Sequence, residues 1–104
     1  MASAKQVRVE ATPHAEALLA DLLVAPYEQL SALPETKTRQ LEGFSKPVAL
    51  TTYRDVRPDG SVQVVVQLAV SGWLGSASFW VEGFTLEQGR SPVRLTPEQL
   101  YDFH

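Results

Sequence analysis

The sequence predicts an α+β protein in which an N-terminal helical segment packs on one face of an antiparallel β-meander of four to five strands. Apolar residues recur at helical spacing in the first third of the chain, and β-branched residues separated by turn signals dominate the rest. A chain of 104 residues with 44% hydrophobic content matches one domain with a single core. We therefore assign residues 1–104 to one α+β domain.

The helical segment is expected over residues 13–33. Thr12 can cap the free amides at its start, and Pro13 suits the first helical position, where an N–H would have no partner. Pro26 should kink the helix or restart it. The predicted apolar stripe consists of Ala15, Leu18, Leu19, Leu22, Leu23, Tyr27, Leu30 and Leu33. Residues 1–11 are expected to be frayed or to form a short edge strand.

Strands are expected to follow the helical segment, separated by residues typical of turns. The predicted strands are residues 36–42, 48–56, 62–70, 76–86 and 92–95. A short helical turn should close the chain, because Thr96 and Gln99 have the spacing of a capping box and Pro97 lies inside it.

The turn between the two central strands predicts their register. Pro58 suits the second position of a type I turn, and Gly60 suits the left-handed bulge position that follows. This turn pairs Val56 with Val62 and places the apolar residues of both strands on the same face. A shift of one residue would separate the two apolar sets, so we favour the bulged turn.

The next strand is registered through an assumed four-residue turn at residues 72–75, which places Phe79 and Val81 on the core face. The opposite face then carries aromatic side chains rimmed by polar ones, a composition typical of protein interaction sites. Its predicted members are Tyr53, Val65, Gln67, Trp80, Glu82 and Phe84. Alternatively, the terminal residues 1–11 or 97–104 fold over this face and bury it within the monomer.

Charge is distributed unevenly along the chain. The net charge of −3 argues against a general nucleic-acid-binding protein. Residues 37–57 carry five cations against two anions, a net charge of +3. Such cations discourage the pairing of a strand edge with a foreign strand, and the alternative is a docking strip for an acidic partner. Arg54 falls on the core face, where we expect its guanidinium to reach water or the carboxylate of Glu28 or Glu35.

No combination of residues in the sequence indicates catalysis, a cofactor or a metal site. His14 and His104 have no companion at metal-ligand spacing, and the chain has no cysteine. Asp55 and Glu82 could act as a carboxylate pair only in a cleft, which a flat sheet face does not supply. We therefore expect a protein that is not an enzyme and that uses no cofactor.

The sequence leaves two functions from different classes. The first is an interaction module that forms a homodimer, or binds another protein, through the outer sheet face or an edge strand. The second is a small-ligand carrier or sensor with a pocket between helix and sheet. The most apolar stretch, residues 17–25, is much shorter than the roughly 20 residues of a membrane span, and the start lacks a signal peptide's apolar run. We expect a cytoplasmic protein that binds neither membranes nor nucleic acids.

Overall fold

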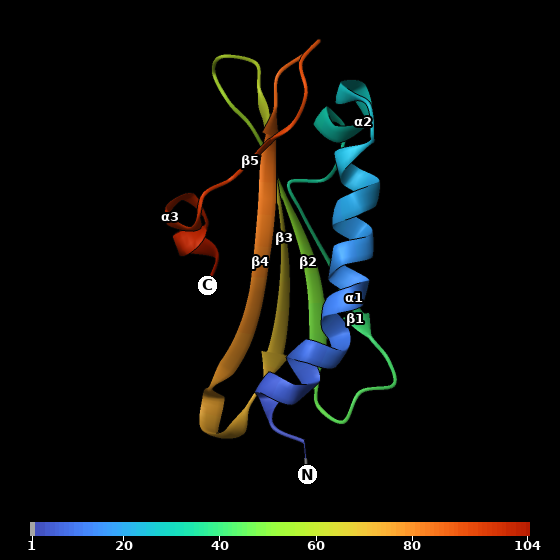
Figure 1. Ribbon diagram of the computed structural model, residues 1–104, viewed down its shortest axis with the longest axis vertical. Coiled ribbons are helices and arrows are strands. Elements are labelled where there is room, and N and C mark those ends of the chain that lie inside the picture. Colours follow the sequence, from blue (N-terminus) through green and yellow to red (C-terminus); the bar gives the residue numbers. More distant parts are fainter. Residues whose placement is uncertain (1) are drawn as a thin grey trace.

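The computed structural model describes residues 2–104 and has the predicted α+β architecture. Helix α1 (Ala4–Leu23) and the short helix α2 (Tyr27–Ser31) pack on one face of a five-stranded antiparallel sheet. The strands, which pair in chain order, are β1 (Thr36–Leu41), β2 (Val48–Val56), β3 (Val62–Ser71), β4 (Ala77–Leu86) and β5 (Val93–Arg94). The turn η1 (Trp73–Gly75) joins β3 to β4, and α3 (Pro97–Leu100) and the 3₁₀ turn η2 (Tyr101–Phe103) close the chain. Figure 1 shows α1 and α3 on opposite sides of the sheet.

Helix α1 begins well before the predicted start at residue 13. The Ser3 hydroxyl accepts a hydrogen bond from the N–H of Gln6 (3.2 Å), and the Gln6 side chain accepts one from the N–H of Ser3 (2.9 Å). These reciprocal bonds form a capping box that starts the helix at Ala4. The prediction that residues 1–11 are frayed or form an edge strand is therefore wrong from Ala4 onward, and residue 1 lies outside the described residues.

Pro13 lies inside α1 instead of at its first position. Proline cannot donate a hydrogen bond to the carbonyl of Val9, four residues earlier, and its ring crowds that carbonyl. Both residues are exposed, so the missing bond lies on the solvent side of the helix. Figure 1 shows the first turns of α1 tilted relative to the rest of the helix, a bend that a proline produces.

The chain breaks after α1 at Pro26, as predicted. Pro26 is the residue before the first turn of α2 and has an extended backbone. Arg54, on β2, reaches this region from the core side of the sheet. Its Nε donates to the carbonyl of Leu33 (2.9 Å), so a backbone oxygen takes the place of the predicted carboxylate of Glu28 or Glu35.

The register of β2 and β3 is confirmed over the whole length of the hairpin. At its turn, the N–H of Arg57 donates to the carbonyl of Ser61 (2.8 Å), and Gly60 has a φ of 87°. The hydroxyl and the N–H of Ser61 both donate to the carboxylate of Asp59 (2.7 and 2.9 Å). The hydroxyl bond, followed by the N–H bond, lowers the pKa of Asp59 from its usual value.

The predicted register of β4 is wrong by one residue. Leu68 pairs with Trp80 and not with Phe79. Because a one-residue shift exchanges the two faces of a strand, Trp80 and Phe84 face α1, and Phe79 and Val81 face away from it. Phe84 is fully buried in the core beneath the helices, and Trp80 is half-buried at its margin.

The turn between β3 and β4 explains this shift. The N–H of Gly72 donates to the carbonyl of Ser76 (2.8 Å), and the N–H of Ser76 donates to that of Trp73 (3.1 Å). The connection therefore has three residues and not the assumed four. Leu74 and Gly75 have φ values of 54° and 79°, the pair of positive angles that defines a type I′ turn. A leucine rarely adopts a positive φ, so the sequence carried no clear signal for this turn.

The sheet separates two apolar layers. The inner layer, between sheet and helices, contains Val7, Ala11, Ala15, Leu19, Leu22, Leu30, Val48, Leu50, Val62, Val64, Val66, Leu68, Val70, Phe84 and Leu86. The outer layer contains Val65, Val81, Leu95 and Leu100, with Tyr53, Phe79 and Phe103 packed against it. Strand β3 contributes to both layers, which is why most of its side chains are buried on both faces.

Replacement of Gly60 tests the turn between β2 and β3. A Cβ at this position would meet no atom within 4 Å, so the cost of a side chain comes from the backbone angle alone. We expect Gly60→Val to lower the free energy of unfolding by about 1–2 kcal/mol. Gly60→Asn should cost clearly less, because asparagine tolerates a positive φ. Urea titration measures both, and a Gly60→Val protein as stable as the parent would contradict the turn.

Two phenylalanines on opposite faces of β4 test the observed register. We expect Phe84→Ala to lower the free energy of unfolding by about 3–5 kcal/mol, because it leaves a cavity beneath α1. Phe79→Ala should cost less than half as much, because Phe79 is half-buried on the other face. Denaturant unfolding measures the stability of the two variants. A larger loss of stability in Phe79→Ala than in Phe84→Ala would contradict the observed register and support the one predicted from the sequence.

Candidate functional site

The six residues predicted to form one interaction face divide between the two faces of the sheet. The outer face, which we define as the face away from α1, carries Tyr53, Val65 and Gln67, whereas the face toward α1 carries Trp80, Glu82 and Phe84. The one-residue shift of β4 is the cause. The predicted aromatic patch is therefore not assembled, and the candidate carboxylates Asp55 and Glu82 lie on opposite sides of the sheet.

The C-terminal segment, residues 95–103, covers the centre of the outer face. Leu95 and Leu100 pack on Val65 and Val81, and all four side chains are buried. The alternative prediction, in which residues 97–104 fold over this face, is thus the one that the structure follows. Because the cover comes from the chain itself, the middle of the outer face offers no free apolar surface to a partner.

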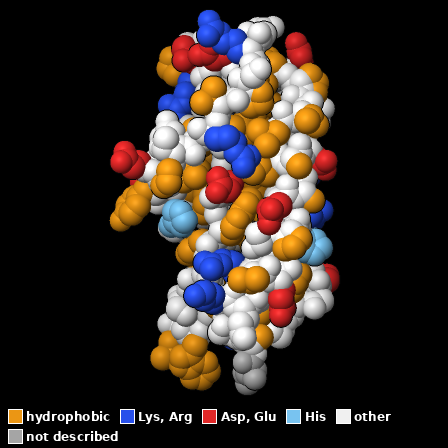
Figure 2. All heavy atoms as spheres, in the orientation of Figure 1, with side chains coloured by type: hydrophobic (Ala, Val, Ile, Leu, Met, Phe, Trp, Pro, Cys, Tyr) orange, Lys and Arg blue, Asp and Glu red, His pale blue; other side chains and the backbone are white. Residues whose placement is uncertain are grey.

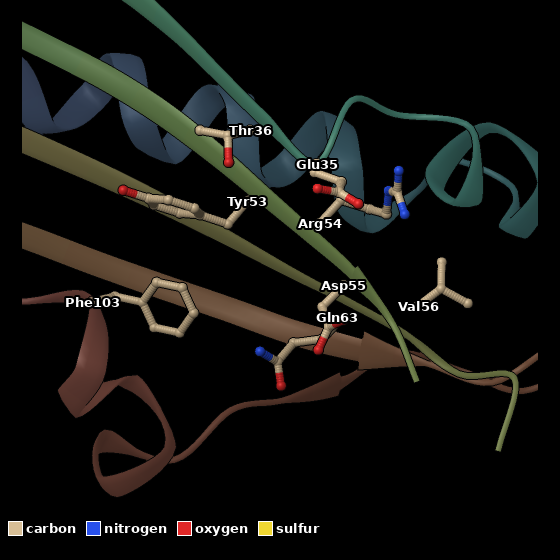
Figure 3. Close-up of a pocket in the computed structure, with 8 residues that line it drawn as sticks. All are labelled: Glu35, Thr36, Tyr53, Arg54, Asp55, Val56, Gln63 and Phe103. Carbon is tan, nitrogen blue, oxygen red and sulfur yellow. The ribbon is translucent and has the colours of Figure 1, made fainter. Parts of the chain in front are cut away.

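A polar pocket of about 440 Å³ lies at the margin of this cover. It is lined by Glu35, Thr36, Tyr53, Arg54, Asp55, Val56, Gln63 and Phe103 (Figure 3). Tyr53 and Phe103 form a tilted pair with ring centres 5.2 Å apart, and the guanidinium of Arg57 donates to the Gln63 side chain. The Glu35 and Asp55 residues are exposed, which is not the environment that prepares a carboxyl group for acid–base catalysis. No group of three or more metal-ligating side chains occurs in the described part of the chain.

The space between α1 and the β1–β2 side of the sheet is nearly filled. The cavity there, lined by Leu18, Lys37, Arg39, Leu50 and Thr52, has a volume of about 100 Å³. Binding sites for small molecules usually have volumes of roughly 300–1,000 Å³. This side of the helix therefore provides packing for the core and little room for a carried ligand.

One edge of β4 is free over the first half of the strand. Strand β5 pairs only with Phe84 and Thr85, and the N–H of Leu95 extends this ladder to the carbonyl of Gly83 (3.0 Å). Within residues 2–104, no strand pairs with the outer edge of residues 77–82. Such an edge presents backbone donors and acceptors to any strand that approaches.

The ladder with β3 determines which backbone groups face this free edge. In an antiparallel pair, alternate residues bond to the neighbouring strand and the residues between them turn their N–H and C=O outward. The bonded pair at the turn places Ala77, Phe79 and Val81 in the outward set. The Arg8 guanidinium donates to the carbonyl of Phe79 (3.3 Å), as this orientation requires.

A groove lined by both apolar and charged side chains runs beside the free edge, between α1 and β4. It comprises two hollows of about 490 and 370 Å³ that share Glu16 and Trp80 in their walls. Val9, Pro13 and Leu23 of α1 contribute further apolar side chains to the two hollows. Figure 2, which looks onto this side of the molecule, shows hydrophobic side chains gathered along its middle. A free strand edge beside a groove with pockets for side chains is the arrangement that accepts an added β-strand.

The other edge of the sheet has features that oppose pairing. Every residue of β1 before Leu41 is polar and exposed. The side chains of Lys37 and Arg39 lie on the face of β1 toward α1, beside the cavity at Leu18. Inward-pointing cations of this kind prevent edge-to-edge association. The two edges therefore differ in chemistry, and β4 is the one suited to a partner.

Comparison with protein-family models, with curated proteins and with solved structures found no match for this chain. In the described residues, no helix has the length and hydropathy needed to cross a membrane. The free edge of β4 and its groove are therefore the candidate functional site on structural grounds alone.

Adjacent residues of the C-terminal segment test whether this segment covers the outer face. Leu100 is buried against β3 and β4, whereas Tyr101 is exposed. We expect Leu100→Ala to lower the free energy of unfolding by about 2 kcal/mol or more, and Tyr101→Ala by about 0.5 kcal/mol or less. Thermal or urea unfolding distinguishes them, and equal small effects would mean that the segment does not stabilise the fold.

Proposed function

We propose that this chain is a non-catalytic interaction module that forms a homodimer by antiparallel pairing of the free edges of two β4 strands. The observation that supports the proposal most directly is the unpaired stretch of residues 77–82, which is rich in apolar side chains and lies beside the groove at Trp80. Exposed edges of this kind are usually blunted in monomeric proteins, as β1 is here. A partner strand would satisfy the outward-facing backbone groups.

The free stretch is self-complementary in one register. A two-fold axis at Phe79 pairs this residue with the partner's Phe79, and pairs Ala77 with the partner's Val81. These residues all turn their backbone groups outward, so each pair can exchange two hydrogen bonds. The paired stretch ends before Gly83, where β5 begins. The Phe79 carbonyl can keep its bond to Arg8, because a carbonyl oxygen accepts two hydrogen bonds.

Charge complementarity favours the same arrangement. The two-fold axis reverses the partner strand and brings Glu82 opposite the partner's Ser76. That end of the strand lies beside the first turns of α1, since a Cβ built on Gly72 would lie 3.5 Å from the Cβ of Ala4. These turns carry Lys5 and Arg8. A negative side chain from one copy thus approaches positive side chains of the other, which favours association in this orientation.

Trp80 supplies the apolar anchor of the proposed interface. Its side chain is half-buried between α1 and β4, and it faces the groove. In the two-fold register it stands opposite the partner's Ser78, whose small side chain leaves room for the indole ring. Tryptophan residues at the centre of an interface often contribute a large share of the binding energy. The alternative function, a small-ligand carrier, has less support because the more enclosed cavity between helix and sheet is about 100 Å³, and the larger hollows between α1 and β4 lie open beside the free edge.

A proline in each sheet edge tests the proposal. Ala77→Pro removes an outward-facing N–H from the free edge of β4 and leaves its ladder with β3 intact. Gln40→Pro is the matched control, because Gln40 has its N–H on the outward side of the β1 edge. At about 100 μM, well above a micromolar dissociation constant, we expect light scattering to find dimers for the parent and for Gln40→Pro.

The Ala77→Pro protein should have the mass of a monomer and the circular dichroism of the parent. A monomeric parent would contradict the homodimer. A dimer that survives Ala77→Pro would place the interface somewhere other than the free edge of β4.

A further inference from the structure

The turn between β3 and β4 exposes two large hydrophobic side chains at one end of the molecule. Trp73 is 79% exposed and Leu74 is 88% exposed. We call these two residues the hairpin tip. Figure 1 places η1 at the end of the long hairpin, and Figure 2 shows hydrophobic side chains protruding from the same end. Neither residue packs in the inner or the outer apolar layer.

Leu74 is also held in an unfavourable backbone conformation. Its φ of 54° and ψ of 43° lie in the left-handed region, and every other residue with positive φ in residues 2–104 is a glycine. Asparagine, aspartate or glycine is the usual residue at the first central position of a type I′ turn. The leucine therefore strains the turn and buries nothing within the chain. A binding partner for the exposed side chain would explain why a leucine, and not asparagine or glycine, occupies this position.

Other segments of the chain end beside the hairpin tip. The N–H of Ser71 donates to the carbonyl of Pro47 (3.1 Å), which joins the loop between β1 and β2 to this end of the sheet. The start of α1 is also adjacent, because the Cβ of Ala4 lies 3.5 Å from the Cβ that a side chain at Gly72 would have. Residues 2–9 and 42–47 therefore belong to segments that reach the same end of the sheet as the tip.

These neighbouring segments carry an excess of positive charge. Together with residues 71–77 they contain the cations Lys5, Arg8 and Lys46 and the single anion Glu42, three positive charges against one negative, or +2. The chain as a whole carries −3. The charge of the segments at this end of the sheet thus has the opposite sign to the charge of the molecule, and it is complementary to an anionic surface.

We propose that the hairpin tip docks on a lipid bilayer that contains anionic phospholipids. Trp73 and Leu74 enter the interfacial region, where tryptophan side chains are enriched. Lys5 and Lys46 belong to the segments at this end of the sheet, and each basic residue adds attraction to an anionic leaflet. The expectation of no membrane partner rested on the lack of a membrane-spanning segment, which a docking tip does not need.

Docking at the tip does not depend on the proposed homodimer. In a dimer that pairs two antiparallel β4 strands, the two tips lie at opposite ends, so each tip meets a membrane alone. Membrane docking therefore gains nothing from dimerisation on a single bilayer. The two proposals share the cations at the start of α1 but rest on different features, the free edge of β4 and the exposed hairpin tip, and they fail in different measurements.

Vesicle sedimentation tests the proposal. We expect the full-length parent to sediment with phosphatidylcholine–phosphatidylserine vesicles at low salt, and much less with pure phosphatidylcholine. Leu74→Asn should lower the partition coefficient about tenfold, which corresponds to the loss of most of a leucine's apolar transfer energy. Lys46→Gln should lower it about fivefold on the anionic vesicles alone. Val24→Ser is the matched control, because Val24 is also exposed (84%) but lies at the other end of α1.

Leu74→Asn separates a binding defect from a folding defect. Asparagine suits the first central position of a type I′ turn, so this variant should be at least as stable as the parent. A parent that does not sediment with anionic vesicles overturns the proposal, as does an equal loss of binding in Val24→Ser. If Leu74→Asn changes the mass of the free protein in light scattering and not its vesicle binding, the tip is a protein contact and membrane docking is excluded.

Discussion

The three-residue connection between β3 and β4 determines which side of the sheet each β4 side chain faces. Gly72 and Ser76 are hydrogen-bonded across it, and every later pair in the ladder follows from this one. A connection longer by one residue would turn Phe84 out of the inner layer and bring Phe79 in. The inner layer, the outer cover and the groove at Trp80 all depend on this turn.

Strand β3 has a similar effect on the architecture as a whole. Its inner face is apolar throughout and its outer face carries the buried Val65, so each face has a cover. Helix α1 provides one cover and the C-terminal segment provides the other. To reach the outer face, the chain leaves the sheet after a β5 strand of two residues. The short β5 leaves half of the β4 edge unpaired, and the free edge is thus a consequence of covering the second face.

The two surfaces that we propose as functional come from the same β3–β4 hairpin but use different physical properties. The free edge offers directional backbone hydrogen bonds, which select an extended chain as partner. The hairpin tip and its neighbouring segments offer apolar side chains and cations, which select a surface with an apolar interior and negative charge. Exposed apolar side chains at the tip and an unpaired strand at the edge are both unfavourable in the isolated monomer, and the two proposed contacts would each relieve one of them.

The sequence by itself determined the fold class, the break at Pro26 and the register of the central hairpin. These features depend on local patterns: apolar periodicity in α1, and the turn chemistry of Pro58 and Gly60 between strands whose apolar residues align in one register only. The start of α1 had a local signal too, in Ser3 and Gln6, but Thr12 and Pro13 formed a competing start. The facing of β4 had no local signal, because both of its faces are partly apolar, and either register buries a phenylalanine. Only the tertiary structure decided it, through a positive φ at Leu74 and through covers on both sides of the sheet.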